Sequence, residues 1–421
     1  MLSRLKFYAV QAAESLWFRP AAYAGLSLLV LAAPPLVEPF IPWGWKDLIS
    51  ASTNETILTI LASSLLAVAI FSLSAMVSAL RAASDAATPR ARPLLVGDAA
   101  AQNAISTFIG AFLFSLLGVV GTLLDVFSAT GRVLLFVVTL VLVFVVVATL
   151  IRWLQRLSKL GDVMESIRRV EQATRGALQH EAAPRPASTL ETRGFEPGVA
   201  VWAQGPGFVQ DIDLESLRGV CTRERLQIRI AARVGDFTDP YAPLVTLDAG
   251  ASEAVEDAIR AAFTLGDQRY FQSDPRLGLT VLSEIASKAL SPGINDPGTA
   301  IGALRAAQRV LDGWGRQDGA ADAGAGPADS GPCVIVPPLT PDEAFALAFN
   351  PAAFDGGHRP DITTTLLSVY AGLRAAQPLV FGPTAKAMAA DLAARAEAHM
   401  SHAADIDGFR AELRRLGFAA T

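Results

Sequence analysis

An uninterrupted apolar run constrains this chain more than any other feature of its sequence. Residues 133–151, which begin Val-Leu-Leu-Phe-Val-Val-Thr-Leu-Val, contain no ionisable side chain. About 20 such residues in a helix cross the hydrocarbon core of a bilayer, whereas the buried strands and core helices of soluble proteins are shorter. The run therefore predicts a transmembrane helix.

Three further segments have the same character, at residues 21–37, 57–80 and 103–124. The first is the shortest and ends at Pro34-Pro35, so a cleaved signal peptide is the alternative reading of it. Only 18% of the residues are charged, against about 25% in an ordinary soluble domain. We therefore expect a membrane α-helical domain of four transmembrane helices over residues 1–151, followed by a soluble α+β region.

The basic residues of the short connections predict an orientation, because cytoplasmic loops carry an excess of Lys and Arg. One side carries Arg4, Lys6, Arg19, Arg81, Arg90, Arg92, Arg152, Arg156 and Lys159, and the other only Lys46 and Arg132. We expect both termini and the soluble region to be cytoplasmic. The soluble region contains both cysteines, Cys221 and Cys333, which form no disulfide framework or zinc motif, as is typical of a reducing compartment.

The second span differs from the others because it is rich in hydroxyl groups. It carries Ser63, Ser64, Ser72, Ser74 and Ser78, and Asn54 and Glu55 lie at its outer mouth. These residues are candidates for lining a narrow aqueous path in a homo-oligomer. The commoner reading is that small residues let helices pack closely. No ionisable residue lies in the middle of any span, which counts against a proton pump.

Changes of period divide the soluble region. Trp153, Leu157, Leu160, Met164 and Ile167 follow a heptad spacing, which predicts a helical stalk that continues the fourth span and favours oligomerisation. The expected order is a stalk at 152–180, a small β-rich subdomain at 190–250, helical hairpins at 251–314, a flexible linker at 315–332 and a helical region at 333–421.

The most distinctive string of the soluble region is Ser-Pro-Gly-Ile-Asn-Asp-Pro at residues 291–297. Ser291, Asn295 and Asp296 are candidates for binding a ligand beside the free amides of a helix N-terminus. The reading we favour is a rigid turn between two helices, in which Asp296 caps the second one. Ser273 or Asp274 caps the first helix in the same way, with Pro275 in its first turn.

Several classes of function have no support in the sequence. It contains no nucleophile elbow, Walker loop or Rossmann fingerprint, so we expect no enzyme and no cofactor. His399 and His402 have no evident third ligand, and no basic block with aromatics points to nucleic acid. The expected partners are the lipid bilayer and further copies of the chain. Two hypotheses stay open: an oligomeric channel gated by its cytoplasmic domain, and a membrane-anchored sensor or scaffold that binds a small ligand or a protein.

A set of strings between residues 50 and 312 forms a recognisable pattern. They are Thr88-Pro-Arg-Ala-Arg-Pro-Leu-Leu with Asp98, Gly110-Ala-Phe-Leu-Phe-Ser, Gly207-Phe-Val-Gln-Asp-Ile-Asp213, Gly235-Asp-Phe, Gln272-Ser-Asp-Pro-Arg-Leu-Gly-Leu and Leu290-Ser-Pro-Gly-Ile-Asn-Asp-Pro297. This set resembles a family of bacterial membrane proteins known as domain of unknown function 2254. The chain departs from that pattern at Tyr270 and Gly298. The resemblance implies a multi-pass protein of the bacterial inner membrane and no particular activity.

Overall fold

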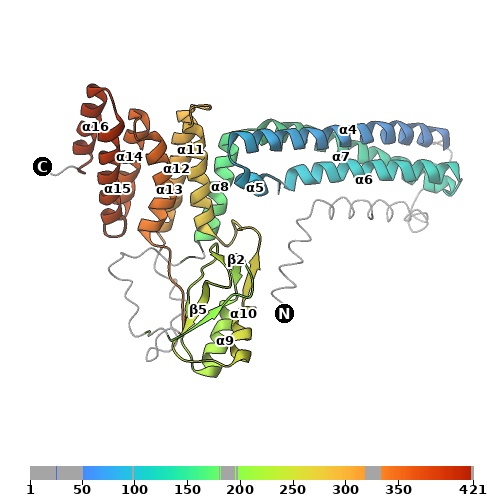
Figure 1. Ribbon diagram of the computed structural model, residues 1–421. Coiled ribbons are helices and arrows are strands. Elements are labelled where there is room, and N and C mark those ends of the chain that lie inside the picture. Colours follow the sequence, from blue (N-terminus) through green and yellow to red (C-terminus); the bar gives the residue numbers. More distant parts are fainter. Residues whose placement is uncertain are drawn as a thin grey trace. The chain divides into compact units, whose positions relative to one another are not determined.

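The computed structural model describes residues 25, 51–96, 99–179, 181, 195, 198–317 and 333–418 (Figure 1). The chain divides into two compact units, Met1–Glu165 and Ser166–Thr421. All but one residue of the expected first span, 21–37, and most of the expected linker, 315–332, lie outside the described residues.

Three long helices form the described part of the first unit: α4 (Ala51–Ala86), α6 (Ala99–Leu123) and α7 (Ala129–Leu160). They run side by side in Figure 1 and pack around an apolar core that includes Leu65, Phe108 and Trp153. A 3-10 turn, η3 (Pro89–Ala91), and α5 (Arg92–Val96) connect α4 to α6. The string at Thr88 builds this turn, because its hydroxyl accepts a hydrogen bond from the amide of Arg90.

The outer surface of this unit carries many large apolar side chains. Phe144 is 75% exposed and Phe71 64% exposed, which water would disfavour and lipid would accept. The segments Ser52–Ala83, Ala101–Leu123 and Gly131–Leu157 are each long and apolar enough to span a membrane. The second, third and fourth expected spans therefore correspond to three described helices. The expectation of four is not confirmed.

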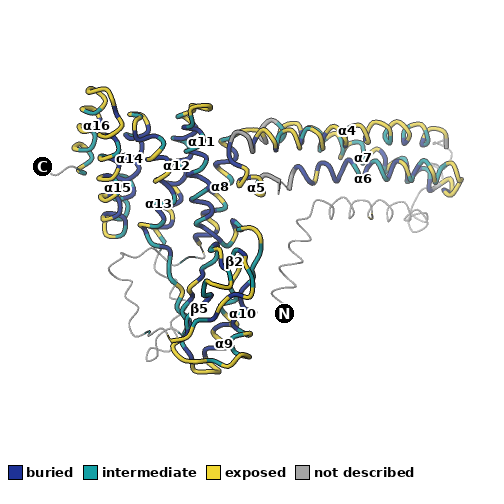
Figure 2. The backbone as a smooth tube through the Cα atoms, in the orientation of Figure 1, coloured by how far each residue is buried: buried dark blue, intermediate teal, exposed yellow. Residues whose placement is uncertain are grey.

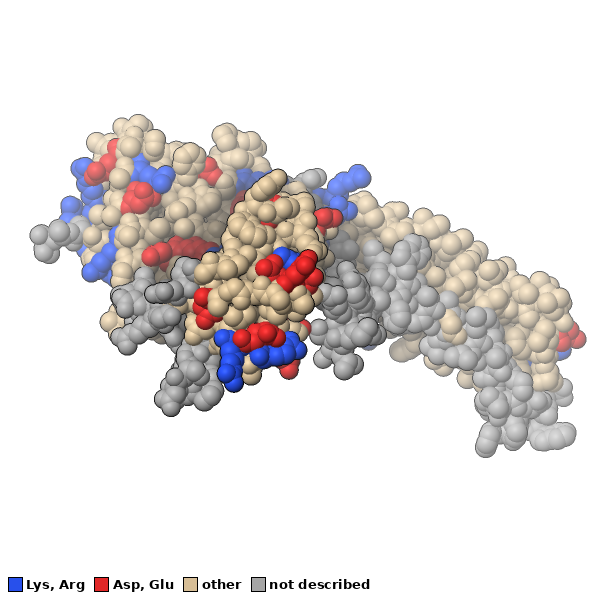
Figure 3. All heavy atoms as spheres, turned by 60° about the horizontal axis from the view of Figure 1, so that its bottom comes forward, with Lys and Arg blue, Asp and Glu red and all other residues tan. Residues whose placement is uncertain are grey.

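Charged side chains mark the ends of the three-helix unit. Figure 3 shows its described surface in tan along the length, with charged residues only toward the ends. Arg81 lies in the last turns of α4, Arg90 lies in η3 and Arg92 begins α5. Arg132 lies at the start of α7 and pairs with Asp125 at 2.9 Å. Among the described residues, arginine is therefore more frequent at one end of the helical bundle than at the other.

The expected continuous stalk at 152–180 is interrupted. Helix α7 ends at Leu160, and α8 (Val163–Leu178) begins after Gly161-Asp162, where the Asp162 carboxylate accepts the amide of Met164 at 2.9 Å. Glycine and a capping aspartate end one helix and start the next. Ile167 and Leu178 of α8 are buried in the second unit, so the heptad seam does not run along one helix.

Two small sheets form the β-rich part of the second unit. One has the strand order β1 (Val199–Trp202), β5 (Pro243–Leu247), β3 (Ile228–Ile230), β7 (Val334–Ile335), and the other has the order β4 (Phe237–Thr238), β2 (Gly207–Ile212), β6 (Phe263–Gly266). All pairings are antiparallel except that of β3 with β7. Helices α9 (Leu214–Glu224) and α10 (Glu253–Ala261) pack on them, and the shared core includes Val201, Leu217 and Ile259.

One strand falls within the region expected to be helical at 251–314. Strand β6 follows α10 directly and pairs with β2, so that Phe263 lies opposite Ile212. Phe263 is buried in the β-rich core. Strand β6 is too short to show an alternation of apolar and polar residues, so its conformation is decided by its pairing with β2.

The rest of the second unit is a stack of helices: α11 (Pro275–Leu290), α12 (Pro297–Gly315), α13 (Pro341–Gly356), α14 (Pro360–Ala376), α15 (Pro378–His399) and α16 (Ala403–Arg415). Each of the first five begins with proline, whose fixed φ and missing amide suit the first helical position. Figure 2 shows their buried faces turned toward one another. The largest buried side chains of this stack are aromatic and include Phe345, Phe349 and Tyr370.

Candidate functional site

The serines of α4 divide into two groups. Ser63, Ser64, Ser74 and Ser78 are exposed and share one side of the helix, within about 100° of arc at 3.6 residues per turn. Ser72 faces the opposite way: it is fully buried, and its hydroxyl has no hydrogen-bond partner among the described residues. A single pore lining made of all five serines is therefore not what the three-helix unit presents.

Two exposed hydroxyls of this face already have partners within the helix. Ser63 Oγ donates to the Ile60 carbonyl at 3.0 Å, and Ser64 Oγ donates to the same carbonyl at 2.7 Å. Serines that bond back to the preceding turn need no water, so this face can lie against lipid, protein or an aqueous path.

The two polar residues expected at the outer mouth have different surroundings. Asn54 is buried, and its Nδ2 donates to the Arg132 carbonyl at 2.8 Å, which ties the start of α4 to the start of α7. Glu55 is half-buried. Asn54 thus has a structural contact at the position where the pore hypothesis placed it.

The turn at 291–297 brings its three candidate residues together and gives each an internal partner. Ser291 Oγ donates to the Lys288 carbonyl at 2.7 Å, and Asn295, with φ at 48°, accepts a bond from Arg359 at 2.7 Å. Asp296 caps α12 by accepting the hydroxyl and amide of Thr299 at 2.6 and 3.0 Å, bonds that lower the pKa of its carboxyl. These contacts agree with the favoured reading of a rigid turn.

Two strings of the recognised pattern meet in a network of charges. The buried Asp274 caps α11 through the amide of Leu277 and accepts Arg269 Nε at 2.6 Å. It faces Gly235, where φ is +89° and where any side chain would overlap the carboxylate. Gly235-Asp-Phe and Ser273-Asp-Pro-Arg therefore fit together as one packed junction.

Two further arginines complete this junction, which we call the arginine–carboxylate network (Arg233, Asp236, Arg269, Asp274, Arg276 and Glu343). Arg276 contacts Asp236 at 2.8 Å, and Arg233 holds Glu343 of α13 through both oxygens, at 2.6 and 3.0 Å. The network links the β2–β4 region to α11 and α13. Every carboxylate in it has an arginine partner, which makes it a structural junction rather than an open binding site.

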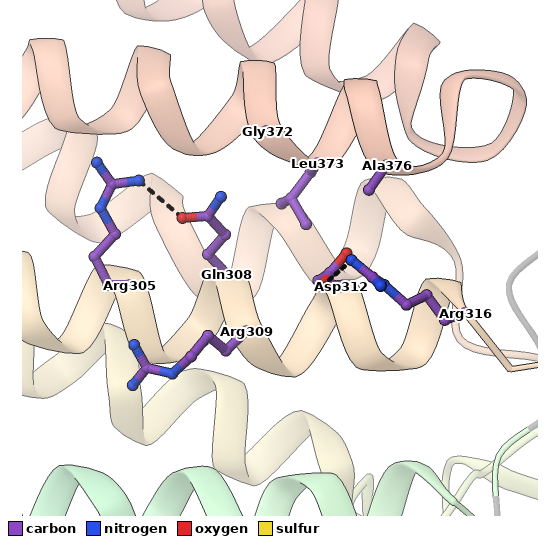
Figure 4. Close-up of a pocket in the computed structure, with 8 residues that line it drawn as sticks. All are labelled: Arg305, Gln308, Arg309, Asp312, Arg316, Gly372, Leu373 and Ala376. Atoms are coloured by element: carbon purple, nitrogen blue, oxygen red, sulfur yellow. Dashed lines mark hydrogen bonds and ion pairs between the residues drawn. The ribbon is translucent and has the colours of Figure 1, made fainter.

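A cavity of the second unit lies elsewhere, between α12 and α14 (Figure 4). Its volume is about 440 Å³. Helix α12 contributes the polar side chains and α14 the small or apolar ones, and the complete lining is Arg305, Gln308, Arg309, Asp312, Arg316, Gly372, Leu373 and Ala376. We call this cavity the α12–α14 pocket.

The arginines of the α12–α14 pocket differ in their partners. Arg309 points away from α14 in Figure 4 and is held by both oxygens of Glu171 on α8, at 2.9 and 2.5 Å. Arg316 is held by Asp312, at 3.1 and 2.9 Å. Arg305 points toward α14, and its partners in the described part of the chain are neutral: it donates to Gln308 Oε1 at 2.9 Å and to Ser368 Oγ at 3.2 Å.

The pocket residues were not singled out in the sequence. A signal was present, because positions 305, 309, 312 and 316 share one face of the helix expected to end near residue 314. Charges on one helical face are usually read as a solvated surface. What the spacing could not show is that Gly372 and Ala376, from a helix far along the chain, leave space opposite them.

The fold defines a class: a membrane protein in which three helices able to span a bilayer precede a helical region with some β-strands. The chain belongs to the DUF2254 family of predicted membrane proteins, whose family model matches residues 13–372. This confirms the resemblance read from the strings above.

The curated relatives are themselves uncharacterised. Over 184 residues the chain is 28% identical to the protein Mb1321c of Mycobacterium bovis and to the protein Rv1290c of Mycobacterium tuberculosis. The match covers 39% of this chain and only 33% of either relative. No solved structure matches the chain.

Proposed function

We propose that this chain is a membrane-anchored, non-enzymatic binding protein whose cytoplasmic second unit takes up a small ligand in the α12–α14 pocket. The pocket carries the proposal, since about 440 Å³ lies within the range of about 300–1,000 Å³ of small-molecule sites. Most such sites are lined mainly by apolar side chains with a few polar groups, and this pocket is more polar, with one polar wall and one wall of small or apolar residues.

The first unit supports a role as anchor. The middle of each described span is free of ionisable groups, which pumps and coupled transporters use. Its exposed serines at 63 and 64 bond to their own helix. The excess of arginine at one end of the bundle favours a cytoplasmic second unit.

The test is a thermal-unfolding screen of the full-length protein in nanodiscs against a library of cationic, neutral and anionic small molecules. We expect at least one compound to stabilise the protein, because a ligand that binds only the folded state raises its stability. Gly372→Val should abolish that effect, since a side chain there pushes Gln308 into the pocket. The proposal is contradicted if no compound stabilises the native protein, or if every compound that does so stabilises Gly372→Val equally.

Gly313→Val is the matched control for this variant. Gly313 lies on α12, and a Cβ there has open space around it. This variant should respond to ligand as the native protein does.

A second candidate, the oligomeric channel, is favoured by the four exposed serines that share one side of α4. Ser74→Leu combined with Ser78→Leu should block ion flux in proteoliposomes if this side lines a path. Val77→Leu is the control, because Val77 is 48% exposed and already apolar. Absence of flux in the native protein, or unchanged flux in the double variant, would exclude this candidate.

A further inference from the structure

We infer that the α12–α14 pocket selects an anion, a small organic molecule with a carboxylate or phosphate group that binds Arg305. The inference rests on the proposed function and specifies its ligand class. It starts from the balance of charge around the pocket.

Arg305 differs from the other arginines of the pocket because no carboxylate balances its charge. Within the described part of the chain, no carboxylate lies within ion-pair distance of it, and its two hydrogen-bond partners, Gln308 and Ser368, are neutral. These bonds fix the guanidinium plane and use two of its five N–H donors. The side chain is half-buried, so the charge is only partly hydrated and an anion would gain more there than in water.

The rest of the pocket does not cancel this charge. Asp312 and Arg316 neutralise each other. Glu171 is shared between Arg309 and Arg175, at 2.5 and 2.9 Å. Of the lining residues, three are arginines and one is a carboxylate. Glu171 pairs with Arg309 from outside the lining, so one positive charge of the pocket, that of Arg305, has no carboxylate partner among the described residues.

The positions of the remaining groups suit an anion with an organic body. Arg305 and Gln308 point from α12 toward α14 (Figure 4). Leu373 is buried and Ala376 half-buried on the opposite wall. An oxyanion on the fork of Arg305 thus places the rest of the molecule near the Gln308 amide and the apolar wall. The planar guanidinium matches the two oxygens of a carboxylate or phosphate.

Titration calorimetry of the full-length protein in uncharged phosphatidylcholine nanodiscs tests the inference. The probes are inorganic phosphate and benzoate as anions, benzyl alcohol as the neutral analogue and benzylamine as the cationic one. We expect an anion to bind and the other two to bind at least about tenfold more weakly, as is usual for loss of a charged hydrogen bond. Nanodiscs with phosphatidylglycerol reveal whether a lipid headgroup competes for the site. Competition would identify the headgroup as the source of the anion, and its absence a soluble anion.

Arg305→Gln should weaken anion binding by about tenfold or more, and Arg305→Lys less, since it keeps the charge without the fork. Arg395→Gln is the matched control, because Arg395 is not among the residues that line the pocket and pairs with Asp391 within α15 at 2.7 Å. Unchanged anion affinity in Arg305→Gln, or binding of neither anion, overturns the inference. If a neutral or cationic ligand then binds in a Gly372-dependent way, the proposed function stands without the anion.

Discussion

At the scale of single residues, Asp274 shows how one side chain serves several neighbours. It is 1% exposed, caps α11 and receives Arg269. Its capping role could be predicted from Asp-Pro before an apolar segment. Its pairing with Arg269 and its fit against Gly235 could not, because neither local propensity nor spacing shows which distant loop faces a helix start.

Gly235→Ala should destabilise the second unit. Its φ of +89° and the overlap of a Cβ with the Asp274 carboxylate both oppose a side chain, and such strain costs about 1–3 kcal/mol. We expect a lower apparent melting temperature of the purified full-length protein. Gly250→Ala is the control, since nothing lies within 4 Å of its Cβ position. Equal melting of the two variants would disprove the packing argument.

Glu181 should make stability depend on pH. Burial raises the pKa of its carboxyl above the ordinary value of 4.5, against the opposing effect of Arg233 and Arg276. Because the folded state binds the proton more tightly, stability falls as pH rises from 4.5 through the raised pKa and is then constant. Glu181→Gln should therefore melt higher than the native protein near neutral pH, and equally in acid.

Asp361→Asn is the control of opposite sign. Arg359 lowers the pKa of Asp361, so this carboxylate stabilises the fold above its unfolded pKa and loses that effect in acid. The variant should melt lower than the native protein near neutral pH. If both variants shift in the same direction at neutral pH, the assignment of Glu181 is wrong.

At the scale of elements, helix starts that depend on a local capping residue could be predicted from the sequence. Elements that depend on pairing with a distant segment could not. Asp274-Pro275 and Asp296-Pro297 start α11 and α12 where the sequence placed them, and Asp213 caps α9. Strand β6 was missed because its four residues depend on β2. The break between α7 and α8 was missed because the heptad spacing continues across Gly161.

Helix α11 packs very closely on α8, and this contact gives an element-scale prediction. A Cβ at Gly278 would overlap the Thr174 side chain, so Gly278→Ala should destabilise the unit by about 1–3 kcal/mol through overpacking. Thr174→Ala in the same protein should recover part of the loss. Chemical denaturation of the single and double variants measures this coupling.

Gly176→Ala on α8 is the control for this cycle, because its Cβ position is open. It should be as stable as the native protein or slightly more so, since alanine favours helix. Additive effects of the Gly278 and Thr174 changes would show that the two helices do not touch there.

At the scale of the whole molecule, composition alone predicted apolar helices at the start of the chain and a region of different character after them. The three apolar runs after residue 50 each became a helix able to span a bilayer. The α12–α14 pocket could not be predicted, because it depends on how two helices more than 60 positions apart are stacked. Of the arginine–carboxylate network, the sequence indicated only the two strings that contain Asp236 and Asp274. It did not indicate that Arg233 and Glu343 join them.

The proposed orientation predicts which loops an external reagent reaches. In a background with Cys221→Ser and Cys333→Ser, Val126→Cys lies between α6 and α7, and Gly161→Cys between α7 and α8. A membrane-impermeant maleimide added to intact cells should label position 126 and spare position 161, because arginines gather at the other end of the bundle. Labelling after permeabilisation controls for access, and the reverse pattern would invert the topology.

The pairing of β3 with β7 has a consequence for how the chain is made. Strand β3 hydrogen-bonds in parallel with residues that leave the ribosome about a hundred positions later, and Arg233 gains Glu343 later still. Until then a nascent chain carries an open strand edge and an arginine that lacks its bidentate carboxylate partner. The β-rich segment therefore gains its last strand only after α11 and α12 have been synthesised, and we expect chains that stop before residue 334 to be less stable and more readily degraded.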